Sequence, residues 1–336
     1  MKPNLFSIAT KELSQDAFIT WLLQWADDKY LNENKVLCNI GKNFVCDLIS
    51  LQYPNKSLII RNVIAGRQWD HIDIWAEVND DYVIIIEDKI NTNQHDNQLE
   101  IYQNQVNEYY KKTKKIIFIY IKTGNDPIDT INKIKELGWN YYSRQQFIDF
   151  LSKHKSESEI YNDFLANLQS IQNRFSSFDE YENLFNWEAT QGLFTYLENN
   201  VVNDWCNWGY VSNKKGGFQG FWSNFTPFAS NNDIELYLQI ENYTYLEDIK
   251  LFIKIKGDWN GELNFLYELL YILINEGKKL NLSITKPARY RIGEFTSVAI
   301  INDVFIKDKN GKLDFKNLQD KFNTAINLIN TVVLDL

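Results

Sequence analysis

The sequence predicts a mixed α/β fold, a sheet flanked by helices, followed by a second domain of the α+β class. Apolar residues of 10–26 recur at three- and four-residue steps, as in an amphipathic helix. Residues 71–78 alternate between apolar and polar, whereas 82–90 and 115–121 are nearly continuous apolar runs. Strands with such runs are typically covered on both faces. These patterns predict a buried sheet between helical layers.

Two helices are predicted before the sheet. In 10–26, the spacing of Phe18, Trp21, Leu22 and Trp25 marks the buried stripe. The second helix is expected over 35–52. The periodicity then changes, and 58–64 is predicted to be the first strand.

The next two strands are predicted to form a hairpin. Ile72, Ile74 and Ala76 share one face of the strand over 71–78. Asn-Asp-Asp at 79–81 is a turn signal. The β-branched run over 82–90 follows it, so the two strands should pair in antiparallel fashion.

Further helices and strands complete the predicted N-terminal domain. A helix is expected over 94–112, with a buried stripe formed by Leu99, Tyr102, Val106 and Tyr109. We also expect a buried strand over 115–121, a short strand over 139–142 and a helix over 145–153. The resulting order along the chain is helix, three strands, helix, strand.

The rest of the sequence predicts a helical connector and the second domain. The helical pattern continues to about 206, and the sequence Lys-Lys-Gly-Gly at 214–217 breaks it. Beyond this break we expect three strands near 218–225, 234–241 and 249–256, a helix over 260–277, two strands near 281–285 and 295–306, and a last helix over 313–332. The predicted boundaries are therefore 1–170 for the first domain, 171–214 for the connector and 215–336 for the second domain.

Composition narrows the class of protein. The net charge is −9, and the acidic excess is spread over both halves, which disfavours a strong non-specific binder of duplex DNA. The three cysteines form no CxxC pair, which suits a reducing compartment. No apolar run reaches the roughly 18 residues of a membrane span, and the first residues lack the apolar core of a signal peptide. We expect a cytoplasmic protein without a membrane partner.

Three charged residues of the predicted hairpin form the candidate catalytic set. Asp73 lies near the start of the first strand, and Glu87 and Lys89 lie near the end of the second. An antiparallel hairpin brings those two ends together, and alternation places Glu87 and Lys89 on one face. Asp88 should point to the opposite face. The sequence therefore predicts that Asp73, Glu87 and Lys89 converge at one edge of the sheet.

Two carboxylates beside a lysine suit metal-assisted hydrolysis of a phosphodiester. Carboxylate oxygens hold Mg²⁺ or Mn²⁺, and the ion keeps several waters. The ion polarises a phosphoryl oxygen and lowers the pKa of a bound water. The lysine can position that water or stabilise developing negative charge. The carbonyl of Asp88 or Lys89 is a candidate for a further metal ligand.

The motif of Asp73 followed by Glu87-x-Lys89 resembles that of the PD-(D/E)XK nuclease superfamily, whose core order α-β-β-β-α-β matches the prediction for 10–121. Ile72 stands in place of the proline. The sequence IEDKI resembles the E-[DN]-K form of an uncharacterised bacterial branch. In that branch the first helix carries an acidic residue before an apolar stripe. The resemblance thus implies that Glu12 is an additional ligand of the metal or of a water, although an acid in a first helical turn also favours the helix dipole.

A second motif follows on the predicted helix over 94–112. Gln98 and Tyr102 are four residues apart and fit the Q-x-x-x-Y motif of RecB-like nucleases. The resemblance implies that both face the site and contact substrate, and that Gln98 assists catalysis. Gln105 and Tyr109 have the same spacing, and Tyr102 also lies on the apolar stripe, so a core role for Tyr102 stays open.

The expected function is a Mg²⁺- or Mn²⁺-dependent phosphodiesterase acting on DNA, with RNA as an open alternative. The resemblance also implies a role in bacterial defence against foreign DNA, including phage. Residues 215–336 would then recognise substrate, sense a signal, bind a protein partner or form a homodimer. The alternative is a non-catalytic module that binds nucleic acid or protein and retains a nuclease fold.

Overall fold

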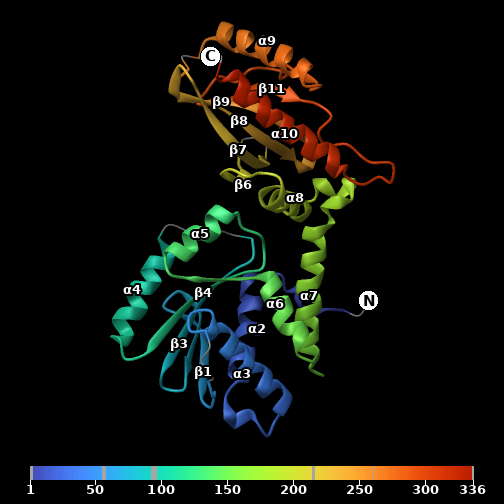
Figure 1. Cartoon of the computed structure of the whole chain (residues 1–336). Coiled ribbons are helices and arrows are strands. Elements are labelled where there is room, and N and C mark those ends of the chain that lie inside the picture. The colour runs from blue at the N-terminus through green and yellow to red at the C-terminus, as the bar shows by residue number, and fades with distance from the viewer. Residues whose placement is uncertain (1–2, 55–57, 92–96, 214–215, 260, 335–336) are drawn as a thin grey trace. The chain divides into compact units, whose positions relative to one another are not determined.

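The computed structural model describes residues 3–54, 58–91, 97–213, 216–259 and 261–334 (Figure 1). The chain divides into two compact units. The first comprises Met1–Asp126 and Thr130–Gln172, and the second comprises Pro127–Asp129 and Asn173–Leu336.

A five-stranded mixed sheet forms the centre of the N-terminal unit. Its strand order is β1-β2-β3-β4-β5. Strands β1 to β3 pair in antiparallel fashion, and β4 and β5 continue the sheet in parallel. The strands are β1 (Val63–Trp69), β2 (Ile72–Val78), β3 (Tyr82–Lys89), β4 (Lys115–Lys122) and β5 (Asn140–Ser143).

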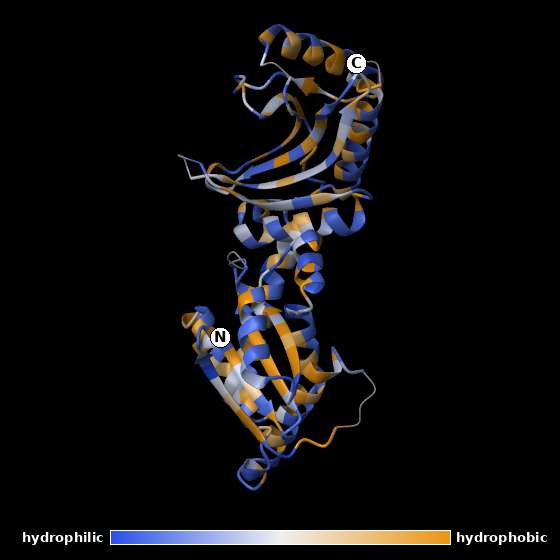
Figure 2. Cartoon of the chain, turned by 90° about the vertical axis from the view of Figure 1, so that its left-hand side faces the viewer, coloured by the Kyte–Doolittle hydropathy of each residue, from blue (hydrophilic) through white to orange (hydrophobic). Residues whose placement is uncertain are grey.

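Helices cover both faces of this sheet. Phe18, Phe44 and Phe147 pack with the even-numbered residues of β3 on one face, and Leu99 and Val106 pack with its odd-numbered residues on the other. Strand β3 is buried along its whole length, and hydrophobic strands lie between the more hydrophilic helices in Figure 2. The helices are α1 (Leu5–Ile8), α2 (Glu12–Gln24), α3 (Lys35–Ser50), α4 (Gln98–Tyr110), α5 (Ile128–Glu136), α6 (Arg144–Lys153) and α7 (Glu159–Ser176).

The predicted fold class and the order of the core elements are confirmed, with two corrections. The strand expected over 58–64 is wrong: β1 begins at Val63 and continues to Trp69. Its polar residues pair with β2 through a tight turn in which Asp70 and His71 adopt positive φ, and apolar periodicity does not reveal such a strand. Helix α5 lies in a segment for which no helix was predicted, and the expected start of α4 at residue 94 lies outside the described residues.

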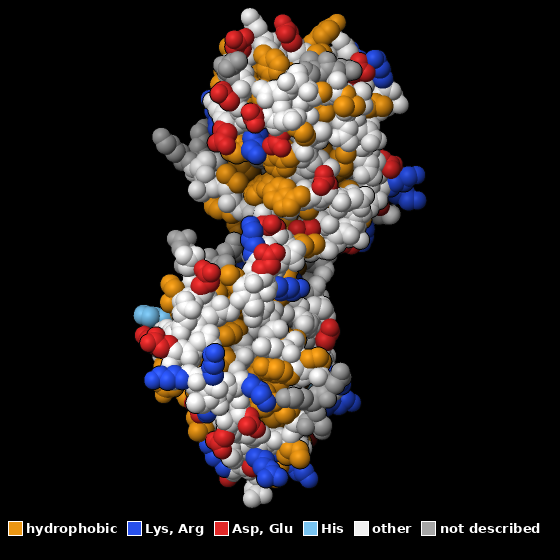
Figure 3. Space-filling view, turned by 60° about the vertical axis from the view of Figure 1, so that its left-hand side comes forward, with side chains coloured by type: hydrophobic (Ala, Val, Ile, Leu, Met, Phe, Trp, Pro, Cys, Tyr) orange, Lys and Arg blue, Asp and Glu red, His pale blue; other side chains and the backbone are white. Residues whose placement is uncertain are grey.

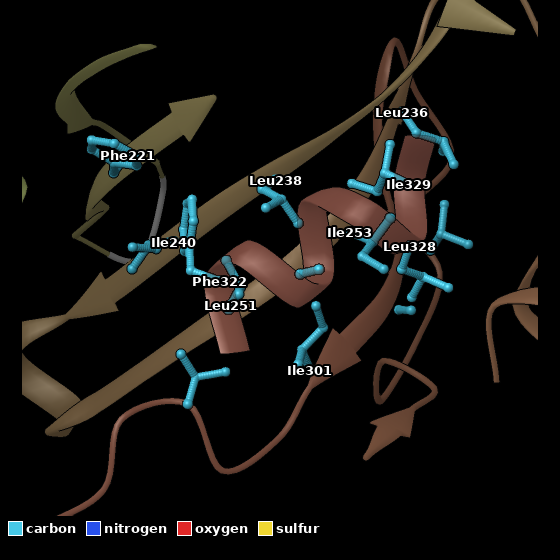
Figure 4. Packing of buried hydrophobic residues seen from close by; sticks show 14 of the residues in the cluster. Phe221, Leu236, Leu238, Ile240, Leu251, Ile253, Ile301, Phe322, Leu328 and Ile329 are labelled. Atoms are coloured by element: carbon cyan, nitrogen blue, oxygen red, sulfur yellow. The ribbon is translucent and has the colours of Figure 1, made fainter. Parts of the chain in front are cut away.

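A six-stranded antiparallel sheet forms the C-terminal unit, with the order β10-β11-β9-β8-β7-β6. Apolar residues of α8, α9 and α10 belong to one cluster with the inward residues of the sheet. Figure 4 shows Phe322, Leu328 and Ile329 of α10 within this core. The strands and helices are β6 (Cys206–Val211), β7 (Phe218–Phe228), β8 (Asn231–Tyr243), β9 (Asp248–Lys256), β10 (Ile284–Thr285), β11 (Phe295–Ile301), α8 (Trp187–Asn200), α9 (Leu263–Lys279) and α10 (Phe315–Val332).

The second sheet confirms the predicted α+β class, and its details differ in two places. Strand β6 lies within 171–214, where only helix was expected, because its Trp-rich sequence pairs with β7. Strand β11 ends at Ile301, short of the predicted end at 306. No helix in the described ranges combines the length and apolarity required to cross a membrane.

Helices α2 and α3 approach each other closely at Gly41. A Cβ atom there would lie 2.7 Å from both the Ala26 amide nitrogen and the Leu22 carbonyl oxygen. These contacts are with backbone, which cannot rotate away. Gly41 therefore fixes the position of α2, the helix that carries Glu12 to the edge of the sheet.

We expect Gly41→Ala to lower the free energy of unfolding by about 1–3 kcal/mol, the usual effect of overpacking. Urea denaturation monitored by tryptophan fluorescence measures the change. The matched control is Gly293→Ala, where a Cβ meets nothing within 4 Å. Equal stability of the two variants would contradict the close approach.

Candidate functional site

The register of the central hairpin places two carboxylates side by side. Ile74 of β2 pairs with Ile86 of β3, so Asp73 lies across from Glu87 one residue farther along the ladder. The Asp73 Oδ2 atom accepts a hydrogen bond from the Asp88 amide, at 3.1 Å. The first strand thus holds its carboxylate against the backbone of the second.

Lys89 completes this cluster. Its Nζ atom lies 3.8 Å from Asp73 Oδ2 and forms an ion pair with Glu87 Oε1. Glu87 is fully buried and Lys89 is 7% exposed. The structure therefore brings together Asp73, Glu87 and Lys89, the three residues of the predicted catalytic set.

Burial dominates the electrostatics of Glu87. It raises the pKa of Glu87 to about 8, and the charge of Asp73 adds to this effect while Lys89 opposes it. Burial alone would lower the pKa of Lys89, but the charges of Glu87, Asp73 and Glu12 raise it above its ordinary value. An ammonium beside two carboxylates is the charge arrangement that favours a protonated lysine.

The Glu87 carboxylate has the properties expected of a metal ligand. Both oxygens are buried; Oε1 forms the ion pair with Lys89, and Oε2 has no hydrogen-bond partner within the described part of the chain. Buried polar atoms normally have partners, and a divalent cation would serve as one. Asp73, Glu87 and a backbone carbonyl fit Mg²⁺, which usually binds one or two carboxylates and retains waters.

The donor set is small. Among the described residues, no group of three or more His, Cys, Asp or Glu side chains is arranged to hold a metal ion. The Lys89 carbonyl already accepts a hydrogen bond from the Thr123 amide, at 3.1 Å. Of the two backbone carbonyls considered, that of Asp88 is therefore the better candidate.

Glu12 reaches the same edge of the sheet from the first turn of α2. Its Oε1 atom accepts a hydrogen bond from the Ile90 amide, at 3.1 Å, just beyond the end of β3. This contact anchors the strand that carries Glu87 and Lys89. Ligation of a metal by Glu12 remains a prediction.

Gln98 and Tyr102 lie on one face of α4 and contact each other. Gln98 Nε2 lies 2.8 Å from the Tyr102 hydroxyl, which donates to the His71 carbonyl oxygen at 2.7 Å. The hydroxyl thus ties α4 to the turn before Asp73, while the ring of Tyr102 packs in the core. The Gln98 Oε1 atom is buried without a hydrogen-bond partner in the described residues, which leaves it able to bind a further group.

The second Gln-Tyr pair has a different environment. Gln105 Nε2 donates to the Asp70 carboxylate at 2.8 Å, and Tyr109 is 65% exposed. Of the two pairs with this spacing, only Gln98 and Tyr102 combine buried polar atoms with a hydrogen bond to the turn before Asp73.

A buried polar cluster on the opposite face of β3 was not predicted. Asp88 points to the opposite face from Glu87, as alternation along the strand requires. Its Oδ1 atom accepts a hydrogen bond from Gln15 Nε2 at 2.5 Å. Gln15 Oε1 in turn accepts from the Thr123 hydroxyl at 3.0 Å. Asp16, 2% exposed, lies beside Asp88 in this cluster. The sequence feature that could have revealed this cluster is the position of Asp16, one turn after Glu12 on a largely apolar helix.

The acids of this cluster carry raised pKa values. Burial raises the pKa of Asp16 to about 6 and that of Asp88 well above its ordinary value. The charges of Asp73 and Glu12 further raise the pKa of Asp16, and those of Asp16 and Asp73 further raise the pKa of Asp88. At low pH, a proton on the pair therefore stabilises the contact between α2 and β3.

In the comparison with known protein families, the model described as PD-(D/E)XK nuclease superfamily matches residues 3–177. The chain belongs to the PD-(D/E)XK nuclease superfamily. The matched segment contains the whole mixed sheet and the cluster of Asp73, Glu87 and Lys89. Enzymes of this superfamily hydrolyse phosphodiester bonds and generally use divalent metal ions. Searches of curated proteins and of solved structures gave no match.

For the N-terminal unit, we expect Asp16→Asn to change stability in a pH-dependent way. The pKa of Asp16 is higher in the folded state than its ordinary value. The contribution of this group to the stability of the wild-type protein is therefore fully present below about pH 4. It is lost as the pH rises through about 6. The free energy of unfolding of the variant, taken relative to wild type, should therefore rise by on the order of 1–3 kcal/mol from pH 4 to pH 7.

Urea denaturation at the two pH values measures this gain. Asp80→Asn, in the exposed turn between β2 and β3, is the control and should shift stability by less than about 0.5 kcal/mol. A pH-independent effect of Asp16→Asn would show that the Asp16 carboxyl does not titrate as described.

Proposed function

We propose that the protein is a divalent-metal-dependent nuclease that hydrolyses DNA at the edge of the N-terminal sheet. The observation that carries this proposal is the convergence of Asp73, Glu87 and Lys89 on one face of the β2–β3 hairpin. The unpartnered Oε2 atom of the buried Glu87 carboxylate supports it, as does membership of the superfamily.

The residues have distinct proposed roles. Asp73, Glu87 and the Asp88 carbonyl hold Mg²⁺ or Mn²⁺, with Glu12 as an additional ligand of the metal or of a water. Bound there, the ion supplies Lewis-acid polarisation of the phosphoryl oxygen and an acidified water. Lys89 orients the attacking water and stabilises negative charge on the phosphate. Gln98 and Tyr102 contact the substrate from α4.

The charge distribution indicates how substrate must be held. On the face shown in Figure 3, Lys and Arg side chains are interspersed with Asp and Glu, and those described form no continuous basic stripe. Non-specific DNA binding depends on such a stripe. We therefore propose that residues 215–336 contribute substrate recognition, a protein partner or a dimer interface.

Asp73→Asn and Lys89→Met should each lower the cleavage rate by at least about 100-fold, the usual cost of removing a group that stabilises the transition state. The assay incubates the protein with single- and double-stranded DNA, and separately with RNA, in Mg²⁺, Mn²⁺ or EDTA. Asp80→Asn at the far end of the hairpin is the control and should retain full activity.

Three outcomes distinguish the interpretations. Cleavage that survives both substitutions contradicts the assignment of the site. Cleavage of RNA but not of DNA would show that the substrate is RNA and would leave the assignment of the site unchanged. If the wild-type protein neither cleaves nucleic acid nor binds metal, it is a non-catalytic module with a nuclease fold.

A role in bacterial defence against foreign DNA is the corresponding cellular proposal, and it rests on analogy with the superfamily. Expression of the wild-type protein in a bacterial host should lower the plating efficiency of a susceptible phage at least about tenfold. Asp73→Asn should abolish this effect, because protection would require cleavage. Equal protection by both proteins, measured over a panel of phages, would contradict a nucleolytic role.

A further inference from the structure

A row of polar residues extends the candidate site across the sheet. In the parallel ladder of β3 and β4, Glu87 pairs with Tyr120, and in that of β4 and β5, Tyr120 pairs with Tyr141. Residues paired in this way project from the same face. Tyr120 accordingly belongs to the cluster on the α4 side of the sheet, the side on which Glu87 lies.

The ring of Tyr120 is held firmly. It stacks on the Tyr141 ring with centroids 5.9 Å apart and planes inclined at 21°. The Tyr141 hydroxyl donates to Asp126 at 3.4 Å, and Asp126 forms a 3.0 Å ion pair with Lys122. Lys122 and Asp126 are both almost completely buried, so this scaffold leaves Tyr120 little freedom to turn its hydroxyl elsewhere.

The hydroxyl of Tyr120 has no hydrogen-bond partner among the residues that the structure describes, although the side chain is completely buried. Burial raises the pKa of Tyr120, and the charges of Asp126 and Glu87 raise it further. Among the described residues, no hydrogen bond joins the hydroxyl to either carboxylate.

Tyr120 and Glu87, which are paired across the parallel ladder, each carry a buried oxygen without a hydrogen-bond partner among the described residues. A buried hydroxyl without a partner is destabilising, and Glu87 Oε2, the oxygen not paired with Lys89, also lacks a hydrogen-bond donor in the described chain. A phenol donates and a carboxylate accepts. Buried waters commonly bridge such groups when direct contact is out of range.

We propose that Tyr120 is a positioning residue of the nuclease site: its hydroxyl donates a hydrogen bond to a buried water that in turn donates to the Glu87 carboxylate. The inference rests on the proposed function of Glu87 as a metal ligand. The bridge fixes the orientation of this carboxylate before the ion binds. Tyr120 itself touches neither substrate nor metal.

The test is Tyr120→Phe, which removes one oxygen and keeps the stacked ring. The dissociation constant for Mn²⁺, measured by titration calorimetry, should rise about tenfold. At saturating Mn²⁺, kcat for DNA should fall about tenfold while KM for DNA stays unchanged. The melting temperature should stay within about 2 °C of wild type, because the bridge is one hydrogen bond among many.

Tyr142→Phe is the matched control. Tyr142 is the next residue after Tyr141 in β5, is equally buried, and donates to Asp47 on the other side of the sheet. This variant should bind Mn²⁺ like the wild-type protein. A loss common to both variants would indicate a general effect of removing a buried hydroxyl and would overturn the proposal.

A crystal structure of the wild-type protein gives a second, independent measurement. It should contain a water within about 3.2 Å of both the Tyr120 hydroxyl and the Glu87 carboxylate. The proposal would be overturned if Tyr120→Phe bound Mn²⁺ as tightly as the wild-type protein, or if the crystal structure contained no such water. Either result would leave the nuclease function intact. Failure of the wild-type protein to bind Mn²⁺ and to cleave DNA would overturn both.

Discussion

The burial of the Glu87 carboxylate is the constraint around which the N-terminal unit is organised. A fully buried carboxylate is costly unless it is paired. Lys89 offsets part of that cost through its ion pair with Glu87, yet Asp73 brings a second negative charge to the same place. The resulting excess of negative charge is reduced by protonation of Glu87 or by a bound cation.

The elements around β3 hold this arrangement in place. Helix α2 contacts the strand twice, through Glu12 at the Ile90 amide and through Gln15 at the Asp88 carboxylate. Helix α4 is tied by Tyr102 to the turn that precedes Asp73. These contacts explain why a site built on strand ends can be rigid: each strand end is fixed by a hydrogen bond to a helix on one side of the sheet or the other.

The two faces of β3 separate the site from its support. On one face, Glu87 and Lys89 lie in line with Tyr120 and Lys122 of β4. On the other, the wholly inaccessible Asp88 accepts a hydrogen bond from Gln15, which Thr123 holds in turn. An acid on the first face can act on a bound phosphate, whereas an acid on the second can only stabilise the strand that carries the site.

The sequence by itself determined the order of the core elements and the pairing of Asp73 with Glu87 and Lys89. It could do so because alternation along a strand and a short turn fix both the face and the register. Strands β1 and β6 were missed because their apolar periodicity is weak, and pairing with a neighbouring strand decided both. Helix α5 carries Ile128, Ile131 and Ile134 at helical spacing, but it is short and was missed. The Asp16–Asp88 contact and the alignment of Tyr120 with Glu87 join residues far apart in the chain. Only the packing of α2 on the sheet and the parallel register of β3 and β4 decided them.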